Sequence, residues 1–181
     1  MRLFKHFIAI VIAISVANGA NAASRVEQLQ AAYLVNFFKF VRWPKSSGTL
    51  TICFLRRAQV YDLLQLGIAS EQRWARIEGR TLGVRLLLDP ASSDGCHMLY
   101  LDARTAEIFW NKVTPRDAML TVSDLPDFVR LGGMIQLDTD GSDVNFAINK
   151  TRVNKSGLVI SAALGTLAVR MENARIGAGG T

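Results

Sequence analysis

Four short apolar runs, separated by turn residues and helical patterns, constrain the fold of this chain most strongly. The runs cover residues 50–55, 80–88, 96–101 and 118–122. Gly, Pro, Asp and Ser residues separate them, which predicts buried strands. Amphipathic helical patterns lie between them, over residues 58–67 and 105–113. Strands that alternate with helices predict a mostly parallel sheet with helices on both faces.

Two further runs, residues 133–138 and 143–148, flank Asp140-Gly141, a typical hairpin turn. They predict an antiparallel hairpin at one edge of the sheet. A strand order of second, first, third and fourth, as in doubly wound folds, places the strand at 50–55 beside the strand at 96–101. The chain of 181 residues has no internal repeat and no linker, so we expect a single α/β domain.

Helical patterns also begin and end this domain. Residues 25–42 contain no Gly or Pro, and Ser24 and Glu27 form a capping box. Apolar residues with helical spacing predict a face that packs on the sheet, at positions 26, 29, 33, 37 and 40. Phe38 falls outside that main stripe, so we expect it to contact a partner if its ring is exposed. Residues 153–171 predict the final helix.

The first 22 residues have the three parts of a secretory signal. Arg2 and Lys5 supply positive charge, the apolar run FIAIVIAISVA follows, and Ala-Asn-Ala at 20–22 matches the cleavage pattern. The apolar run is shorter than the roughly 20 residues that span a bilayer, which disfavours an uncleaved anchor. We therefore expect export to the periplasm, a domain over residues 23–175 and a flexible tail over residues 176–181.

Export changes how the charge of the chain is interpreted. The net charge is +6, and removal of Arg2 and Lys5 leaves 19 basic against 15 acidic residues. An exported protein meets no genomic nucleic acid. The excess of positive charge suits binding to anionic polymers, lipid head groups or an acidic partner. Alternatively, these charges are simply solvated. No second apolar run has membrane-spanning length, so we expect no direct membrane insertion after signal cleavage.

The chain has two cysteines, Cys53 and Cys96. An even pair in an exported protein favours a disulfide, and the strand order above makes their strands neighbours. The bridge would close a loop of about 44 residues and contribute on the order of 4 kcal/mol. Two inert buried thiols are the alternative. We predict no metal site with His97, because the spacing matches no zinc pattern and Cys96 and His97 point to opposite faces of a strand.

The sequence offers little catalytic chemistry. His97 is the one histidine after the predicted cleavage site, and it starts a buried strand, where a structural role is typical. Ser123-Asp124 matches a helix cap and not a nucleophile elbow. The glycine motifs that bind phosphates or dinucleotides are absent. Solvated carboxylates are typical around a turn such as 140–141. We therefore predict that the protein is not an enzyme and holds no cofactor.

Six motifs, taken in order, resemble those of one known family. They span residues 30–168 and read AAYLVNFFKFVRWP, CHMLYL, MLTVSDLPDF, GGMIQL, VNFAIN and SGLVISAALGTLA. Together they resemble the YfiR-like family of small exported bacterial proteins. The resemblance implies a periplasmic regulator that represses the sensor domain of an inner-membrane diguanylate cyclase, so that its release raises cyclic di-GMP and promotes biofilm formation. It also implies homodimers.

One departure from the family pattern concerns the cysteines. The resemblance implies a second cysteine pair in the C-terminal half, tied to redox state, but no cysteine follows Cys96 in this chain. Thiol-based sensing through that second pair therefore does not carry over. The pair that is retained, Cys53 and Cys96, corresponds to the structural one.

The hypothetical partner surface is the C-terminal region, residues 149–171, where an apolar stripe lies beside basic side chains. The candidate contact residues are Phe38, Lys150, Arg152, Lys155, Leu158 and Met171. For each of these, membership of the core is the alternative. A second class of function also stays open: a ligand-binding or accessory module of a transporter or sensor kinase, with a small-molecule cleft at the strand ends.

Overall fold

The computed structural model describes residues 25–44, 48–70 and 75–172. The predicted signal peptide over residues 1–22 and the predicted tail over residues 176–181 lie outside these ranges, as do both predicted ends of the 23–175 domain. Within the part of the chain that the structure describes, no helix is both long enough and apolar enough to cross a membrane.

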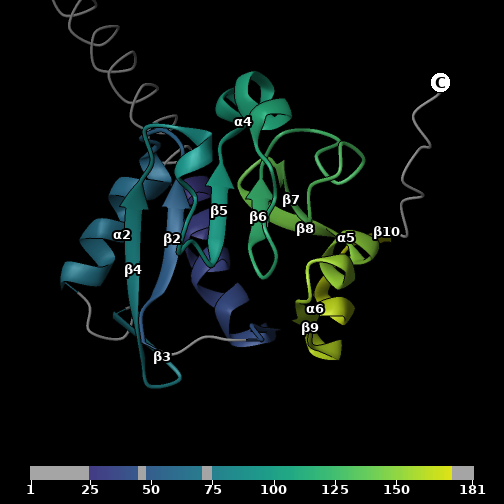
Figure 1. Ribbon diagram of the computed structural model, residues 1–181. Helices are drawn as coiled ribbons and strands as arrows, with labels where there is room; N and C mark the ends of the chain where they lie inside the picture. The colour runs from purple at the N-terminus through teal and green to yellow at the C-terminus, as the bar shows by residue number, and fades with distance from the viewer. Residues whose placement is uncertain (1–24, 45–47, 71–74, 173–181) are drawn as a thin grey trace, which may run out of the picture.

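In the described residues, the centre of the fold is an eight-stranded mixed sheet with the order β10-β8-β7-β6-β5-β2-β4-β3. In chain order the strands are β2 (Leu50–Phe54), β3 (Arg76–Ile77), β4 (Arg80–Leu86), β5 (Met98–Leu101), β6 (Leu120–Ser123), β7 (Ile135–Asp140), β8 (Asp143–Asn149) and β10 (Arg170–Glu172). Strands β4, β2, β5, β6 and β7 are parallel. The arrows of β4, β2, β5 and β6 point to the same edge in Figure 1. This order confirms the predicted α/β class and the predicted arrangement of the first four strands.

The predicted hairpin is formed by β7 and β8. Asp140 pairs with Asp143 at its tip, and Gly141 adopts a φ of 59°, a left-handed conformation that glycine tolerates without a steric penalty. The hairpin was expected at the edge of the sheet. Instead, β10 adds to β8 in a parallel register, so the hairpin lies one strand inside the edge.

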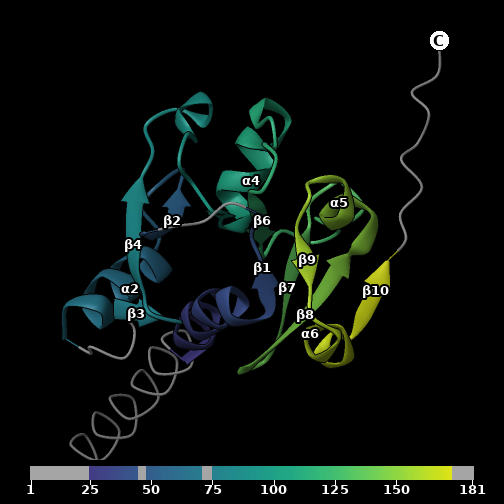
Figure 2. The same ribbon diagram turned by 60° about the horizontal axis from the view of Figure 1, so that its bottom comes forward.

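The two faces of the sheet are covered by different helices. Even-numbered residues of β2 and β5 pack against the N-terminal helix (residues 25–40) and α2 (Gln59–Ser70), and odd-numbered residues pack against α4 (Ala103–Phe109) and η2 (Trp110–Lys112). The alternation follows from the two-residue period of a strand. Figure 2 shows the N-terminal helix and α4 on opposite sides of the strands.

The N-terminal helix ends at residue 40, two residues earlier than predicted. Val41–Arg42 form the short strand β1, which pairs antiparallel with β9 (Val159–Ile160). The buried face is also wider than the predicted stripe. Several of its most buried residues lie between the stripe positions: Ala31, Leu34, Val35 and Phe38. The stripe residues Val26, Leu29, Tyr33 and Phe40 are only partly buried and pack around the border of this core.

The prediction of a single helix over residues 153–171 is wrong. The chain forms α5 (Lys150–Lys155), β9, α6 (Ala162–Leu167) and then β10. Gly157 follows α5 with a φ of 76°, which terminates the helix. Ser161 then caps α6, where its Oγ accepts a hydrogen bond from the Leu164 amide at 3.2 Å. These local signals interrupt an apolar pattern that is otherwise compatible with one helix.

Candidate partner-binding surface and ligand pocket

Cys53 and Cys96 form a disulfide across the centre of the sheet. Cys53 lies in β2, Cys96 lies two residues before β5, and these strands are hydrogen-bonded neighbours. The two Cα atoms are 5.7 Å apart, and the cysteines are 0% and 8% exposed. The predicted bridge is confirmed. Because both sulfurs are bonded to each other, neither is a thiolate ligand for a metal ion in this state.

His97 is held by hydrogen bonds at the beginning of β5. Its Nδ1 accepts a hydrogen bond from the Thr51 amide at 3.2 Å, and its carbonyl accepts one from Trp43 Nε1 at 3.1 Å. Burial, with a smaller contribution from the nearby Arg80 charge, lowers the pKa of the imidazole. The neutral ring can accept the Thr51 bond, so His97 joins β5 to β2 and to the segment after β1.

The predicted partner residues fall into two groups. Lys150 and Lys155 are exposed on α5, and Met171 is 45% exposed on β10. Arg152 is half-buried, and its Nε donates to the carbonyl oxygen of Gly132 at 3.1 Å. That contact ties α5 to the loop before β7, so Arg152 has a structural partner of its own.

Phe38 and Leu158 require a correction, because both are 1% exposed. The Phe38 ring stacks on Trp43 with their centroids 4.8 Å apart, which places it between the helix and the sheet. Leu158 belongs to the same apolar cluster. Both side chains stabilise the fold of the chain itself and offer almost no area to a second protein.

The structure adds apolar residues that the sequence analysis missed. Leu167 is 64% exposed at the end of α6, and Val169 is 55% exposed just before β10. We define the C-terminal surface as Leu167, Val169 and Met171 together with Lys150 and Lys155. It lies at the end of the sheet opposite α2 and β4, as Figures 1 and 2 show. The Ser161 cap, which marks α6 as a separate element, was the sequence signal that could have revealed it.

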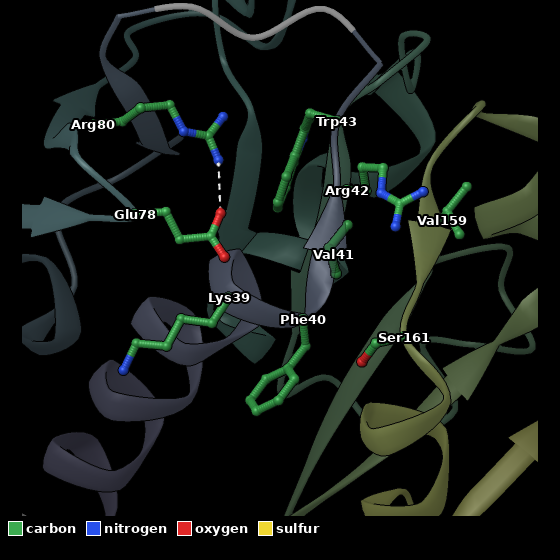
Figure 3. Close-up of a pocket in the computed structure, with 9 residues that line it drawn as sticks. All are labelled: Lys39, Phe40, Val41, Arg42, Trp43, Glu78, Arg80, Val159 and Ser161. Atoms are coloured by element: carbon green, nitrogen blue, oxygen red, sulfur yellow. Dashed lines mark ion pairs between the residues drawn. The ribbon is translucent and has the colours of Figure 1, made fainter.

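A pocket of about 400 Å³ lies where β1, β9 and the β3–β4 turn approach one another. Its lining residues are Lys39, Phe40, Val41, Arg42, Trp43, Glu78, Arg80, Val159 and Ser161. Arg80 and Glu78 form an ion pair with a 3.6 Å separation on one side. Figure 3 shows Trp43 and Arg42 across from them, with the Lys39 ammonium group pointing away from Arg42. The strands β2, β4 and β5 begin near this pocket, at the amino edge of the sheet.

The chemistry of this pocket favours a small anion. Arg42 and Arg80 carry planar guanidinium groups that match carboxylate or phosphate oxygens. Trp43 supplies a rigid apolar wall, because its indole N–H already donates to the His97 carbonyl. Glu78 partly offsets the positive charge through its ion pair with Arg80.

These features describe a small disulfide-linked α/β protein. Its basic pocket and the exposed apolar residues near its last strand are suited to binding. The chain belongs to the YfiR/HmsC-like family, whose profile matches residues 27–169. This confirms the resemblance found in the motifs. Members of the family are periplasmic regulatory proteins without catalytic activity.

Among solved structures, this chain matches a conserved domain protein from Vibrio cholerae O1 biovar El Tor with a TM-score of 0.49 and 14% sequence identity. The match covers 81% of this chain and 60% of that chain. This chain therefore corresponds to less than two thirds of the length of that structure.

Proposed function

We propose that this protein is a periplasmic regulator that binds the sensor domain of an inner-membrane diguanylate cyclase and keeps the cyclase inactive. Membership of the YfiR/HmsC-like family supports this proposal. Tighter binding to the inactive form of the sensor shifts its two-state equilibrium toward that form. Release then raises cyclic di-GMP and promotes biofilm formation.

The exposed apolar side chains of the C-terminal surface are the main structural support for this proposal. Leu167, Val169 and Met171 are between 45% and 64% exposed, and apolar side chains including Met are enriched at the centres of protein interfaces. Among the described residues, β10 is the last strand at this end of the sheet, so its outer edge can accept an added strand. Lys150 and Lys155 on the neighbouring α5 favour an acidic counterpart.

A pull-down tests this surface directly. The mature protein, residues 23–181, is immobilised and exposed to detergent-solubilised inner membranes. We expect it to retain a cyclase with a periplasmic sensor, and we expect Leu167→Ser with Met171→Ser to lose that cyclase. Leu66→Ser is the matched control, because Leu66 is 65% exposed on α2, away from the C-terminal surface. Recovery of no inner-membrane sensor protein would overturn the proposal.

Three accompanying features are proposed with this function. The protein is exported with cleavage after residue 22, is not inserted in the membrane, and forms a homodimer. N-terminal sequencing of periplasmic material should begin at Ala23. Light scattering of the purified mature chain should give twice the monomer mass, and a monomer mass across micromolar concentrations would exclude the dimer.

The pocket in Figure 3 supports a second candidate, a ligand-binding or accessory module of a transporter or sensor kinase. In this case a small anion in the pocket would be the signal. Thermal melts with a panel of carboxylates and phosphates should show a stabilising ligand whose effect is lost in Arg42→Ala. Arg104→Ala is the control, because Arg104 is exposed on α4. A panel without any stabilising anion would remove this candidate.

A further inference from the structure

A second apolar surface lies at the carboxyl edge of the sheet, far from the C-terminal surface. Leu88 is 96% exposed just after β4, and Leu86 is 38% exposed at its end. Beneath them is a pocket of about 420 Å³, lined by Leu55, Arg56, Arg57, Leu86, Leu87, Leu88 and Phe109. A nearly fully exposed leucine beside an apolar hollow is typical of an interaction site.

The rim of this pocket is positively charged. The guanidinium carbon of Arg56 lies 4.9 Å from the centroid of the Phe109 ring, and Lys112 Nζ lies 5.5 Å from the same centroid. Arg57 is neutralised by Asp62, whose Oδ1 is 2.8 Å from its Nε. Asp89, the residue after Leu88, accepts the Ala91 amide as the cap of η1 (Pro90–Ser92), and this neutral donor leaves the carboxylate charge in place. Within the described part of the chain Arg56 and Lys112 form no ion pair, so these two cations are available to acidic groups of a partner.

The topology places this pocket where open α/β sheets bind other molecules. From β2 the chain passes to β4 on one side, and then crosses to β5 on the other side of β2. Binding sites in such sheets lie at the carboxyl ends of the strands that flank this reversal. Leu55 and Arg56 directly follow β2, and α4, which contributes Phe109, follows β5.

We propose that this β4–α4 surface, formed by Leu86, Leu88, Phe109, Arg56 and Lys112, binds a segment of a partner protein that has an apolar anchor residue flanked by carboxylates. The anchor fills the hollow between Leu55, Leu87 and Phe109, and the flanking carboxylates pair with Arg56 and Lys112. This inference is independent of the proposed regulation through the C-terminal surface. Because the two surfaces lie at opposite ends of the strand order, both can be occupied at once.

Other occupants fit the pocket less well. In a two-fold dimer through this surface, the same patch would meet itself, and Arg56 and Lys112 would face their own copies. An anionic bilayer would satisfy the charges, but a flat lipid surface cannot fill a hollow of about 420 Å³. A peptide side chain satisfies both the shape and the charge.

Selection of displayed peptides on the mature protein tests the inference. We expect enriched peptides to share one large apolar residue within a few positions of Asp or Glu. Binding should weaken at least about tenfold in Arg56→Glu and roughly threefold or more in Leu88→Ser, as for central interface residues. Leu66→Ser, which alters another exposed leucine, on α2, should bind as the wild type does. The side chains are exposed, so all three variants should melt like the wild type.

Several outcomes would overturn this inference. They are a selection that enriches no peptide, peptides without acidic residues, and affinities that Arg56→Glu and Leu88→Ser leave unchanged. Sedimentation with phosphatidylglycerol vesicles separates the lipid alternative, because binding that Arg56→Glu abolishes would assign the surface to a membrane. Self-association that Arg56→Glu strengthens would assign it to a second copy of the chain.

Discussion

The two faces of the sheet are stabilised in different ways. The face under the N-terminal helix and α2 contains the larger apolar cluster, with aromatic pairs such as Phe37 and Phe146, whose centroids are 5.4 Å apart. The face under α4 and η2 has a smaller cluster, and the Cys53–Cys96 disulfide lies within it. The face with fewer buried apolar residues is thus held by a covalent link, and the opposite face by buried apolar area.

The covering layer also differs in how many apolar side chains it leaves exposed. The helices over the aromatic face bury or half-bury their large apolar side chains, with Leu66 as an exception at 65% exposure. The carboxyl edge near α4 leaves Leu86 and Leu88 exposed, and the C-terminal elements leave Leu167 and Met171 exposed. Most of these exposed apolar residues thus lie at the carboxyl edge and in the C-terminal elements, where the covering helices are short.

Loss of the disulfide should have the largest effect. Cys53→Ser with Cys96→Ser should lower the free energy of unfolding by about 5 kcal/mol, of which about 4 kcal/mol is the lost crosslink and roughly 1 kcal/mol the burial of hydroxyls. A chemical denaturation series measures this. Reductant should destabilise the wild type and leave the variant unchanged. A loss below about 1 kcal/mol would show that packing alone holds the α4 face.

Truncation of an aromatic side chain tests the opposite face. Phe37 is 0% exposed, so Phe37→Ala should cost about 4 kcal/mol through lost burial and the cavity that remains. The variant should keep its response to reductant, because its disulfide is intact. If Phe37→Ala cost less than about 1 kcal/mol, the aromatic cluster would not be the main support of this face.

Acid should weaken the junction between β2 and β5. Since the pKa of His97 is lowered in the folded protein by burial and by Arg80, the unfolded chain takes up its proton first. The contribution of neutral His97 to the free energy of unfolding is therefore fully present above pH about 6.5. It is lost as the pH falls toward the folded pKa, by up to roughly 1.4 kcal/mol per pH unit. Melts between pH 7 and pH 5 should show this decrease. His97→Gln should remove it, and an identical decrease in that variant would assign it to other groups.

The smallest effect is expected at Asp124, after β6. Its Oδ2 accepts a hydrogen bond from Gln30 Nε2 at 3.1 Å, but burial dominates and raises the pKa of the carboxyl. Ionisation therefore costs stability as the pH rises through the folded pKa. Asp124→Asn should stabilise the protein at pH 7 by less than about 1 kcal/mol, and the gain should vanish at acid pH. A destabilised variant at pH 7 would show that the charge itself is needed.

The buried parallel strands could be predicted from the sequence because burial on both faces leaves continuous apolar runs. The strand order then brought Cys53 next to the strand of Cys96, and the disulfide followed. The hairpin was predicted from Asp140-Gly141, because this dipeptide is typical of a tight turn between two strands. The outer position of β10 was not predictable, because a three-residue strand carries no periodic pattern.

The C-terminal surface was only half predictable. Of the predicted partner contacts, Lys150, Lys155 and Met171 are exposed, whereas Leu158 and Phe38 are core residues. A helical pattern cannot show which apolar side chains are buried when the chain breaks at Gly157 and restarts at Ser161. Leu167 and Val169 were missed because exposure near a short edge strand depends on tertiary packing.

The proposed repression of a diguanylate cyclase through the C-terminal surface is measured most directly by cellular cyclic di-GMP. A deletion strain is complemented with the wild-type chain, with Leu167→Ser and Met171→Ser combined, or with Leu66→Ser. We expect deletion to raise cyclic di-GMP, and we expect the wild type and Leu66→Ser to restore the low level while the double variant does not. Unchanged cyclic di-GMP in the deletion strain, or full restoration by the double variant, would contradict the claim.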